Sequence, residues 1–293
     1  TWPTPVTMRF IPSQAGFIDI VRTDRAGHPL IRVGEATASA NRRHTVLHNG
    51  EVGLRIVEHL MAALALHGIT SVRVEVGGGE PPIADHSAAL FHEALVQAGT
   101  VSAPRPHPPL KVIKPVTVTM NHRQIQVMPS CHTRIEAVAD YTTSRKGFEG
   151  IGREHFIWWE GDDIAPILTA RSPWRAVEYK KWAAVSTLFR PFVGIPAIHQ
   201  RLVEYSQTTE HPLMTNIPFR QSRGLMYARD GTLLPPNGAP KGPHEIAQHH
   251  MTDFVGDLTA RFGHLPQGNY LLFRAGHLLN GYTADALVEE NAL

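Results

Sequence analysis

Cysteine is the scarcest residue type in this chain of 293 residues, where Cys131 stands alone. A single cysteine excludes an internal disulfide and a cysteine-based zinc cluster, and it suits a reducing compartment. Charge of one sign is also lacking, because 28 Lys and Arg nearly balance 26 Asp and Glu to give a formal net charge of +2. Nucleic acid is therefore not an expected partner.

Long apolar runs and low-complexity tracts are absent too. No segment approaches the roughly 20 apolar residues that cross a bilayer, and the opening TWPTPVTMRF lacks the layout of a signal peptide. The 42% hydrophobic content is typical of a globular protein with an ample core. We expect a cytoplasmic protein without a transmembrane segment, and the sequence leaves its oligomeric state open.

Strand and helix patterns recur in both halves of the chain. The first half predicts strands at 6–12, 16–24 and 69–78 and helices at 53–68 and 88–99. The second half predicts a hairpin at 110–130, strands at 134–141 and 268–276, and helices at 244–263 and 278–290. Between them, the proline-rich residues 102–109 suggest a linker. We therefore predict an α+β fold with two domains of similar architecture, residues 1–104 and 105–293.

The segment QHHMTDFVGDL at residues 248–258 gathers two histidines and two aspartates. His249 and Asp253 are four residues apart in a predicted helix, so both side chains can reach one point. An imidazole nitrogen and a carboxylate oxygen on one face form half of a zinc site. Taken alone, a surface histidine and a solvated aspartate are the more common explanation, so ligands from elsewhere must complete the site.

Glu58 and His59 offer such a complement in IVEHLMAAL, the most apolar helix of the first half. Unpaired polar side chains are costly in such a setting. Zinc-dependent hydrolysis needs a histidine that holds the metal and a carboxylate that takes a proton from water. The alternative is that both side chains point to solvent at a helix edge.

A further histidine, His277, follows a predicted strand in FRAGHLLNG and is expected in a loop. Asp257, one turn beyond Asp253, could pair with His277 and keep it protonated. A cationic histidine would suit a general acid that protonates a leaving amine. A loop histidine bonded to the backbone is the alternative.

Four ordered motifs carry a resemblance to a known family. VEHLMAAL, EPPIADHSA, HHMTDFVGDL and AGHLLN resemble TVEHLLAAL, EIPIMDGSA, HKxLDxIGDL and SGHxLN of the UDP-3-O-acyl-N-acetylglucosamine deacetylase (LpxC) family, the zinc amidases of lipid A synthesis. Weaker similarity includes LTARSPWRAVEY and QSRGLM. The resemblance implies two α+β domains that face each other across the active site. It also implies an acylated amino-sugar substrate linked to UDP.

The resemblance assigns the residues that would perform the chemistry. His59, His249 and Asp253 match the zinc ligands, with Fe²⁺ as the alternative ion. Glu58 matches the general base, and His277 matches the general acid. By this resemblance, the protein is expected to be a metal-dependent N-deacetylase that acts on a linear amide.

Further residues follow from the same resemblance. Asp257 matches the carboxylate that supports the general acid, and Ser172 falls where the family has a threonine whose hydroxyl stabilises the oxyanion. Asp85 matches a turn aspartate that we interpret as structural. His250 replaces a lysine near the phosphate side of the substrate, and Pro173 replaces a phenylalanine. Both substitutions are expected to alter substrate contacts.

Two larger departures concern whole segments. The chain begins at Thr1 and lacks the family's opening GxGLHxG, so we expect that the N-terminal part of the first domain is missing, unless the homologue is natively shorter. Residues 180–222 are longer than expected and remain apolar, where the family forms the passage for the acyl chain.

Three functions therefore stay open. The first is the deacetylase of lipid A biosynthesis, and the second is a paralogous zinc amidase that deacetylates a different N-acetylated substrate. The third is a catalytically silent binding homologue. The retention of both Glu58 and His277 argues against the third function, because a pure binding protein needs neither proton carrier.

Overall fold

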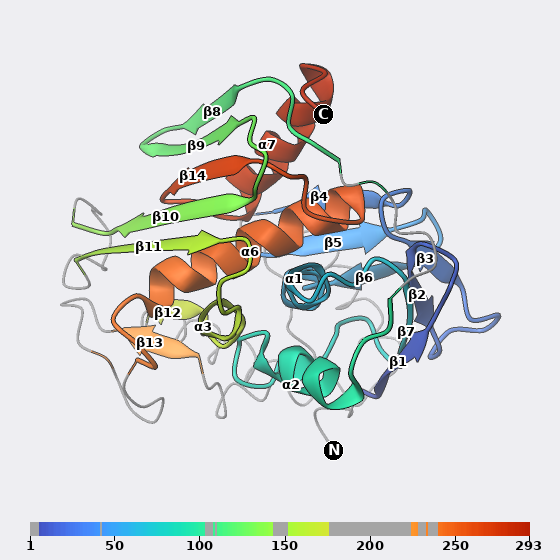
Figure 1. Cartoon of the computed structure of the whole chain (residues 1–293). Coiled ribbons are helices and arrows are strands. Elements are labelled where there is room, and N and C mark those ends of the chain that lie inside the picture. The colour runs from blue at the N-terminus through green and yellow to red at the C-terminus, as the bar shows by residue number, and fades with distance from the viewer. Residues whose placement is uncertain are drawn as a thin grey trace.

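A computed structural model gives the architecture of the chain (Figure 1). It describes residues 6–41, 43–102, 108, 110–142, 152–175, 224–227, 233 and 240–293. The predicted insert at 180–222 and most of the predicted linker at 102–109 lie outside these residues. Several sheets combine with a few helices, which confirms the predicted α+β class.

A four-stranded sheet in the order β1-β7-β2-β3 forms in the first half of the chain. Its strands are β1 (Met8–Pro12), β2 (Ile18–Arg22), β3 (Leu30–Arg32) and β7 (Val72–Val76). Strands β2 and β7 run parallel, whereas β1 and β3 pair antiparallel with their neighbours. A smaller antiparallel sheet contains β4 (Thr37–Ala40), β5 (Thr45–His48) and β6 (Gly53–Arg55).

A five-stranded sheet in the order β11-β10-β14-β9-β8 forms in the second half. Its strands are β8 (Val116–Met120), β9 (Arg123–Met128), β10 (Arg134–Asp140), β11 (Arg153–Trp159) and β14 (Asn269–Phe273). Strands β8 and β9 pair antiparallel, which confirms the predicted hairpin. The short strands β12 (Pro173–Arg175) and β13 (Leu225–Tyr227) pair parallel nearby.

The two larger sheets share one four-strand topology, to which β8 adds a fifth strand in the second half. In each, a central parallel pair (β2 and β7, or β10 and β14) is flanked by antiparallel strands on both sides. The helix before the second parallel strand is α1 (Glu58–Leu66) or α6 (Glu245–Phe262). The helix after it is α2 (Ala89–Ala98) or α7 (His277–Glu289). Helices α1 and α6 are therefore equivalent in the two halves, whereas the domain boundary at 104/105 stays a prediction.

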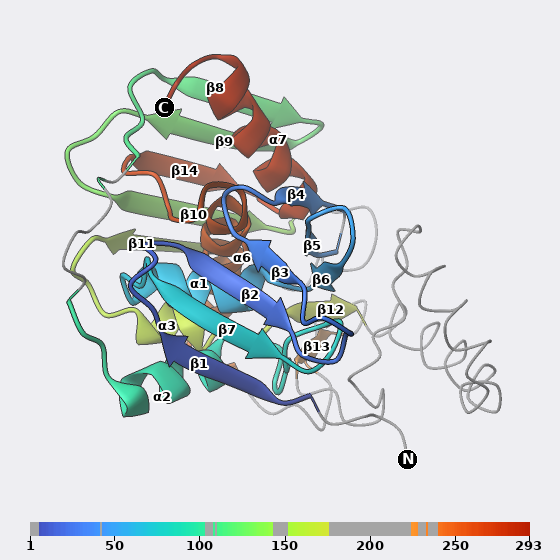
Figure 2. The same cartoon turned by 90° about the vertical axis from the view of Figure 1, so that its right-hand side faces the viewer.

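Helices α1 and α6 pack against each other between the two larger sheets (Figures 1 and 2). Buried apolar residues from both halves form one continuous core. Helix α6 is buried over most of its surface, including the polar His249, Asp253 and Asp257. Buried polar groups are stable only when they are paired, hydrogen-bonded or bound to metal. Among the described residues, no helix combines the length and apolar character that a membrane span requires.

The helix predicted at 53–68 is shorter than expected. Residues 53–55 form strand β6, and the helix begins at Glu58 after Val57. Between them, Ile56 has a φ of 56°, which is incompatible with a continuous helix. The apolar periodicity thus spans a strand and a helix, because both must bury one side in the core.

The predicted end of α6 is confirmed, since Gly263 has left-handed backbone geometry with a φ of 81°.

At Gly256, the backbone of α6 lies directly against the backbone of α1. A Cβ at this position would lie only 1.9 Å from the carbonyl oxygen of Glu58. Replacing Gly256 by alanine is expected to force the two helices apart and to destabilise the protein by about 3 kcal/mol or more. The melting temperature would then fall by about 6–12 °C. Thermal unfolding followed by circular dichroism measures this shift.

Gly242 provides the matched control. A Cβ at Gly242 would meet nothing within 4 Å, so alanine there is expected to change stability by less than about 0.5 kcal/mol. Equal melting temperatures for the Gly256→Ala and Gly242→Ala variants would contradict the close packing of α1 on α6.

Candidate metal centre and active site

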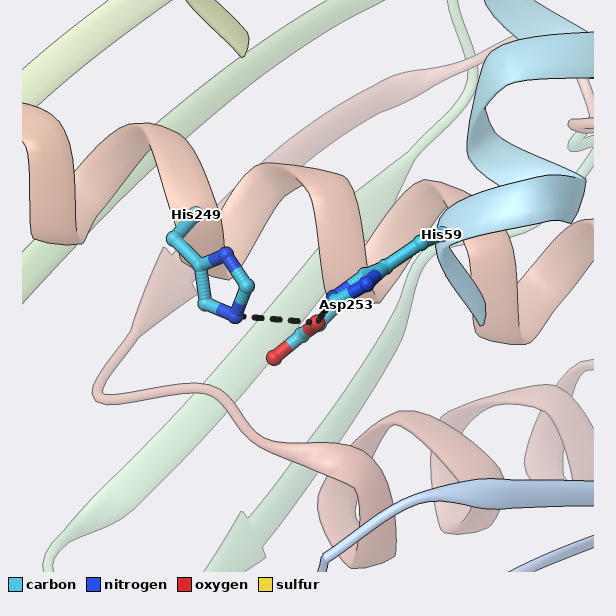
Figure 3. Close-up of side chains that lie close together, drawn as sticks. All are labelled: His59, His249 and Asp253. Atoms are coloured by element: carbon cyan, nitrogen blue, oxygen red, sulfur yellow. Dashed lines mark ion pairs between the residues drawn. The ribbon is translucent and has the colours of Figure 1, made fainter. Parts of the chain in front are cut away.

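Three buried side chains converge where α1 meets α6 (Figure 3). His59 is the second residue of α1, while His249 and Asp253 lie one turn apart on α6. The i to i+4 spacing places the last two on one face of α6, as predicted from the sequence. Packing of α1 on α6 adds His59, which precedes His249 by 190 positions in the sequence. The three residues could hold a metal ion, and we call them the metal group.

Two distances within this group suit a small tetrahedral ion. Oδ1 of Asp253 lies 3.6 Å from Nε2 of His59 and 3.3 Å from Nε2 of His249. Ligand atoms around tetrahedral zinc, with bonds of about 2.0–2.1 Å, are separated by about 3.4 Å. Oδ1 of Asp253 is buried and has no hydrogen-bond partner among the described residues. A metal ion would satisfy this atom, so the residues present fit the predicted cofactor.

The hydrogen bonds of His249 fix its tautomer. Its Nδ1–H donates to the carbonyl oxygen of Ala170 at 3.1 Å, which leaves the lone pair on Nε2. Such a bond is the usual support of a metal-binding histidine. Burial lowers the pKa of His249 despite the opposing effect of Asp253, so the ring is held neutral. A neutral imidazole with its lone pair on Nε2 is the state that metal binding requires.

Glu58 is also buried, which excludes the alternative that it points to solvent. Its Oε2 accepts a hydrogen bond of 3.0 Å from the backbone N–H of Thr45. Burial raises the pKa of Glu58 to about 7, while nearby His277 and His59 partly oppose that rise. A carboxylate with a pKa near neutrality can both accept and release a proton at physiological pH.

His277 is the first residue of α7, so its predicted loop position is wrong. The helix begins one residue earlier than expected because Gly276 ends the preceding loop with an extended backbone. The predicted pairing is present: Nδ1–H of His277 donates to Oδ2 of Asp257 at 2.9 Å. Nε2 of the same ring lies 3.6 Å from Oδ2 of Asp253 and therefore beside the metal group.

The charges around His277 favour its cationic form. Burial opposes a cation, but Asp257 and Asp253 together outweigh it and raise the pKa of His277 well above its ordinary value. Glu58 contributes in the same direction. The arrangement thus brings together a buried carboxylate of raised pKa and a carboxylate-paired histidine beside one metal group. Such a pair can remove a proton at one point and deliver a proton at another.

Ser172 lies at the same centre. Its hydroxyl donates to Nε2 of His249 at 2.8 Å, at the ring atom that faces the metal group. Its backbone N–H donates to the carbonyl oxygen of His86, in the connection between β7 and α2 that contains the EPPIADHSA motif. The neighbouring Pro173 begins β12, outside the group of metal-binding side chains. In the same loop as His86, Asp85 accepts hydrogen bonds from Ser87, as expected for a structural turn.

His250 makes a different contact from its neighbour His249. Its Nε2 shares a hydrogen bond of 3.1 Å with the hydroxyl of Tyr141, the residue that follows β10. Burial lowers the pKa of His250 to about 4, despite the nearby Asp253, so the ring is neutral at pH 7. Position 250 therefore carries no positive charge, whereas the family resemblance implies a lysine there.

Two contacts in the site were not predicted from the sequence. The side-chain amide of Asn280 donates to Oδ2 of Asp257 at 2.8 Å, and the hydroxyl of Thr45 donates to Oδ1 at 2.7 Å. Asn280 could have been found, because it lies one turn after His277 in AGHLLN. Thr45 carries no local signal, since 212 positions separate it from Asp257.

Comparison with known proteins agrees with this geometry. Residues 3–172 match the family described as LpxC, UDP-3-O-acyl N-acetylglycosamine deacetylase. Relatives named UDP-3-O-acyl-N-acetylglucosamine deacetylase include that of Geotalea uraniireducens, 34% identical over 94% of this chain and 79% of the relative. The protein from Trichormus variabilis is 26% identical over 93% of this chain and 87% of the relative. The protein from Lawsonia intracellularis is 26% identical over 98% of this chain and 83% of the relative.

These matches define the class of enzyme to which the protein belongs. The protein is a hydrolase, a metal-dependent N-deacetylase. Within that class, the chain belongs to the LpxC family, which confirms the resemblance of its four motifs.

Proposed function

We propose that the protein hydrolyses the acetamide of UDP-3-O-acyl-N-acetylglucosamine in lipid A biosynthesis, releasing acetate and a free amine. The observation that carries this proposal is the placement of Glu58 and His277 beside one metal group. The names of the relatives supply the substrate. A cytoplasmic location accords with a nucleotide-linked substrate and stays a prediction.

His59, His249 and Asp253 would hold the metal, which we propose to be Zn²⁺ because two imidazoles and one carboxylate are a common zinc set. Three protein ligands are typical of a catalytic rather than a structural zinc site. When bound there, the ion would polarise the amide carbonyl and make water a stronger acid. Without an ion, Oδ1 of Asp253 is buried and has no hydrogen-bond partner in the part of the chain that the structure describes.

Glu58 would act as the general base. The backbone N–H of Thr45 holds Oε2, which leaves the other carboxylate oxygen to receive a proton from the attacking water. His277 would act as the general acid, because Asp257 holds its Nδ1 and directs Nε2 toward the metal group. The proton on Nε2 would pass to the departing amine nitrogen as the C–N bond breaks.

Ser172 would help to stabilise the oxyanion of the tetrahedral intermediate. Its hydroxyl lies at the metal-facing edge of His249, within reach of a carbonyl oxygen bound at this centre. A hydroxyl donor at a developing negative charge lowers the barrier of acyl transfer. The role that the family resemblance implies for Ser172 thus remains a proposal with supporting geometry.

A second substrate class is favoured by one observation. His250 is neutral and bonded to Tyr141, so it offers no positive charge to a diphosphate. A different N-acetylated amine without a nucleotide would not need such a charge. The reaction and the proton carriers would be the same for both substrates, so the assay must compare them directly.

An acetate-release assay tests the proposed function. Zinc-loaded protein is expected to release acetate from UDP-3-O-acyl-N-acetylglucosamine, to lose activity on chelation and to recover it with added Zn²⁺. The His249→Ala variant is expected to lose bound zinc, measured by atomic absorption, and to lose activity with it.

The comparison substrates are simple N-acetyl sugars without UDP. Faster release from these sugars would select the second substrate class. Full activity in thoroughly metal-free protein would overturn the assignment of His59, His249 and Asp253. A matched control is His155→Ala, since His155 is an exposed histidine on β11 outside the metal group.

A further inference from the structure

Thr45 forms hydrogen bonds with two carboxylates of the site. One belongs to Glu58, the proposed general base, and the other to Asp257, which pairs with the proposed general acid. The residue begins β5 and is only 2% exposed. Its backbone N–H donates to Oε2 of Glu58, and its hydroxyl donates to Oδ1 of Asp257. The carbonyl oxygen of Thr45 also accepts the N–H of Val57, which immediately precedes α1. One residue of the small sheet therefore fixes both a carboxylate on α1 and a carboxylate on α6.

The hydroxyl completes the hydrogen bonding of Asp257. Oδ2 of this carboxylate accepts from Nδ1 of His277 and from the amide of Asn280, whereas Oδ1 accepts the hydroxyl of Thr45. Donors on both oxygens prevent the carboxylate from rotating about its terminal bond. The ring of His277 is hydrogen-bonded to this carboxylate, which links the hydroxyl of Thr45 to the histidine through Asp257.

We propose that Thr45 is a positioning residue for the general acid, acting on His277 through Asp257. This inference rests on the proposed function, in which His277 delivers the proton to the leaving amine. Removing the hydroxyl would leave Oδ1 of Asp257 buried without its donor and free the carboxylate to turn. The imidazole would then occupy the productive orientation for a smaller part of the time.

The Thr45→Val variant removes only the hydrogen bond to Asp257, because valine keeps the shape of threonine and the backbone N–H that holds Glu58. We expect kcat to fall by about 10- to 100-fold, the usual cost of removing one donor from a buried charged acceptor. KM is expected to change by less than about threefold, because the hydroxyl does not contact the substrate, and zinc content should be unchanged. Thr45→Ser retains the hydroxyl and should restore most of kcat.

Thr283→Val is the matched control. The buried hydroxyl of Thr283 on α7 donates only to the backbone carbonyl of Leu279 among the described residues, so its loss should leave kcat unchanged. A second test combines Thr45→Val with Asp257→Asn. If Thr45 acts through Asp257, the valine change should lower kcat much less in the Asp257→Asn background than in the parent.

A readout independent of activity separates this inference from the proposed function. Compared with the parent protein, the ring ¹⁵N resonances of His277 are expected to shift in the Thr45→Val variant and to stay in place in the Thr283→Val variant. A shift in a protein that releases no acetate would refute the proposed function and retain the link from Thr45 to His277. Unshifted resonances, an unchanged kcat, or an undiminished effect in the Asp257→Asn background would each overturn the inference.

Discussion

Replacing Glu58 by glutamine is expected to lower kcat by about 10²- to 10⁴-fold, the usual contribution of a general base. Glutamine has nearly the same shape and can still accept the N–H of Thr45, but it cannot take up a proton from water. KM and zinc content should change little, because Glu58 is not a member of the metal group. Steady-state acetate release, corrected for zinc content, measures the loss.

Glu93→Gln serves as the control for this prediction. Glu93 lies exposed on α2, so the same chemical change there should leave kcat within about twofold of the parent, as expected for a surface substitution. A Glu58→Gln variant that kept more than a tenth of the parental kcat would remove Glu58 from the role of general base.

Replacing His277 by alanine is expected to have an effect of similar size. The variant loses the proton donor for the leaving amine, so kcat should fall by about 10²- to 10⁴-fold. The change also removes the cation that pairs with the buried Asp257, so the activity must be expressed per folded, zinc-loaded molecule. Circular dichroism and metal analysis supply that correction.

The pH profile distinguishes this variant from a merely damaged protein. In the proposed mechanism, activity needs Glu58 ionised and His277 protonated, so kcat/KM of the parent should rise with pH through the pKa of Glu58 and fall through that of His277. Burial raises the pKa of Glu58 to about 7, and a bound dication would favour the carboxylate and move the rising limb below pH 7. Asp257 and Asp253 overcome burial and raise the pKa of His277, and the same dication would oppose that rise, so the falling limb is expected on the alkaline side of the rising limb.

The His277→Ala variant should lose the falling limb and keep the rising limb. The His155→Ala control should keep both, because His155 is exposed and pairs only with Glu136 among the described residues. A falling limb of unchanged position in His277→Ala would assign the general acid to another group.

The sequence by itself determined the parts of the site that lie close along the chain. The four-residue spacing of His249 and Asp253 sets one helical face, and the next turn adds Asp257. Glu58 and His59 stand together at the start of one apolar helix. These relations follow from helix geometry, which is the same in every protein, and the motif order then indicates the family. The strand alternation likewise predicted most of both large sheets.

Only the tertiary structure decided how these pieces meet. It placed His59 against Asp253, the hydroxyl of Ser172 on His249, and Thr45 across Glu58 and Asp257. It also paired His250 with Tyr141 and began the helix predicted at 53–68 only at Glu58. Contacts between elements depend on how whole faces pack, with Gly256 allowing α6 to touch α1. No local spacing records that packing, so the candidate metal ligands could be predicted from the sequence, whereas Thr45, the residue proposed to align the proton donor, could not.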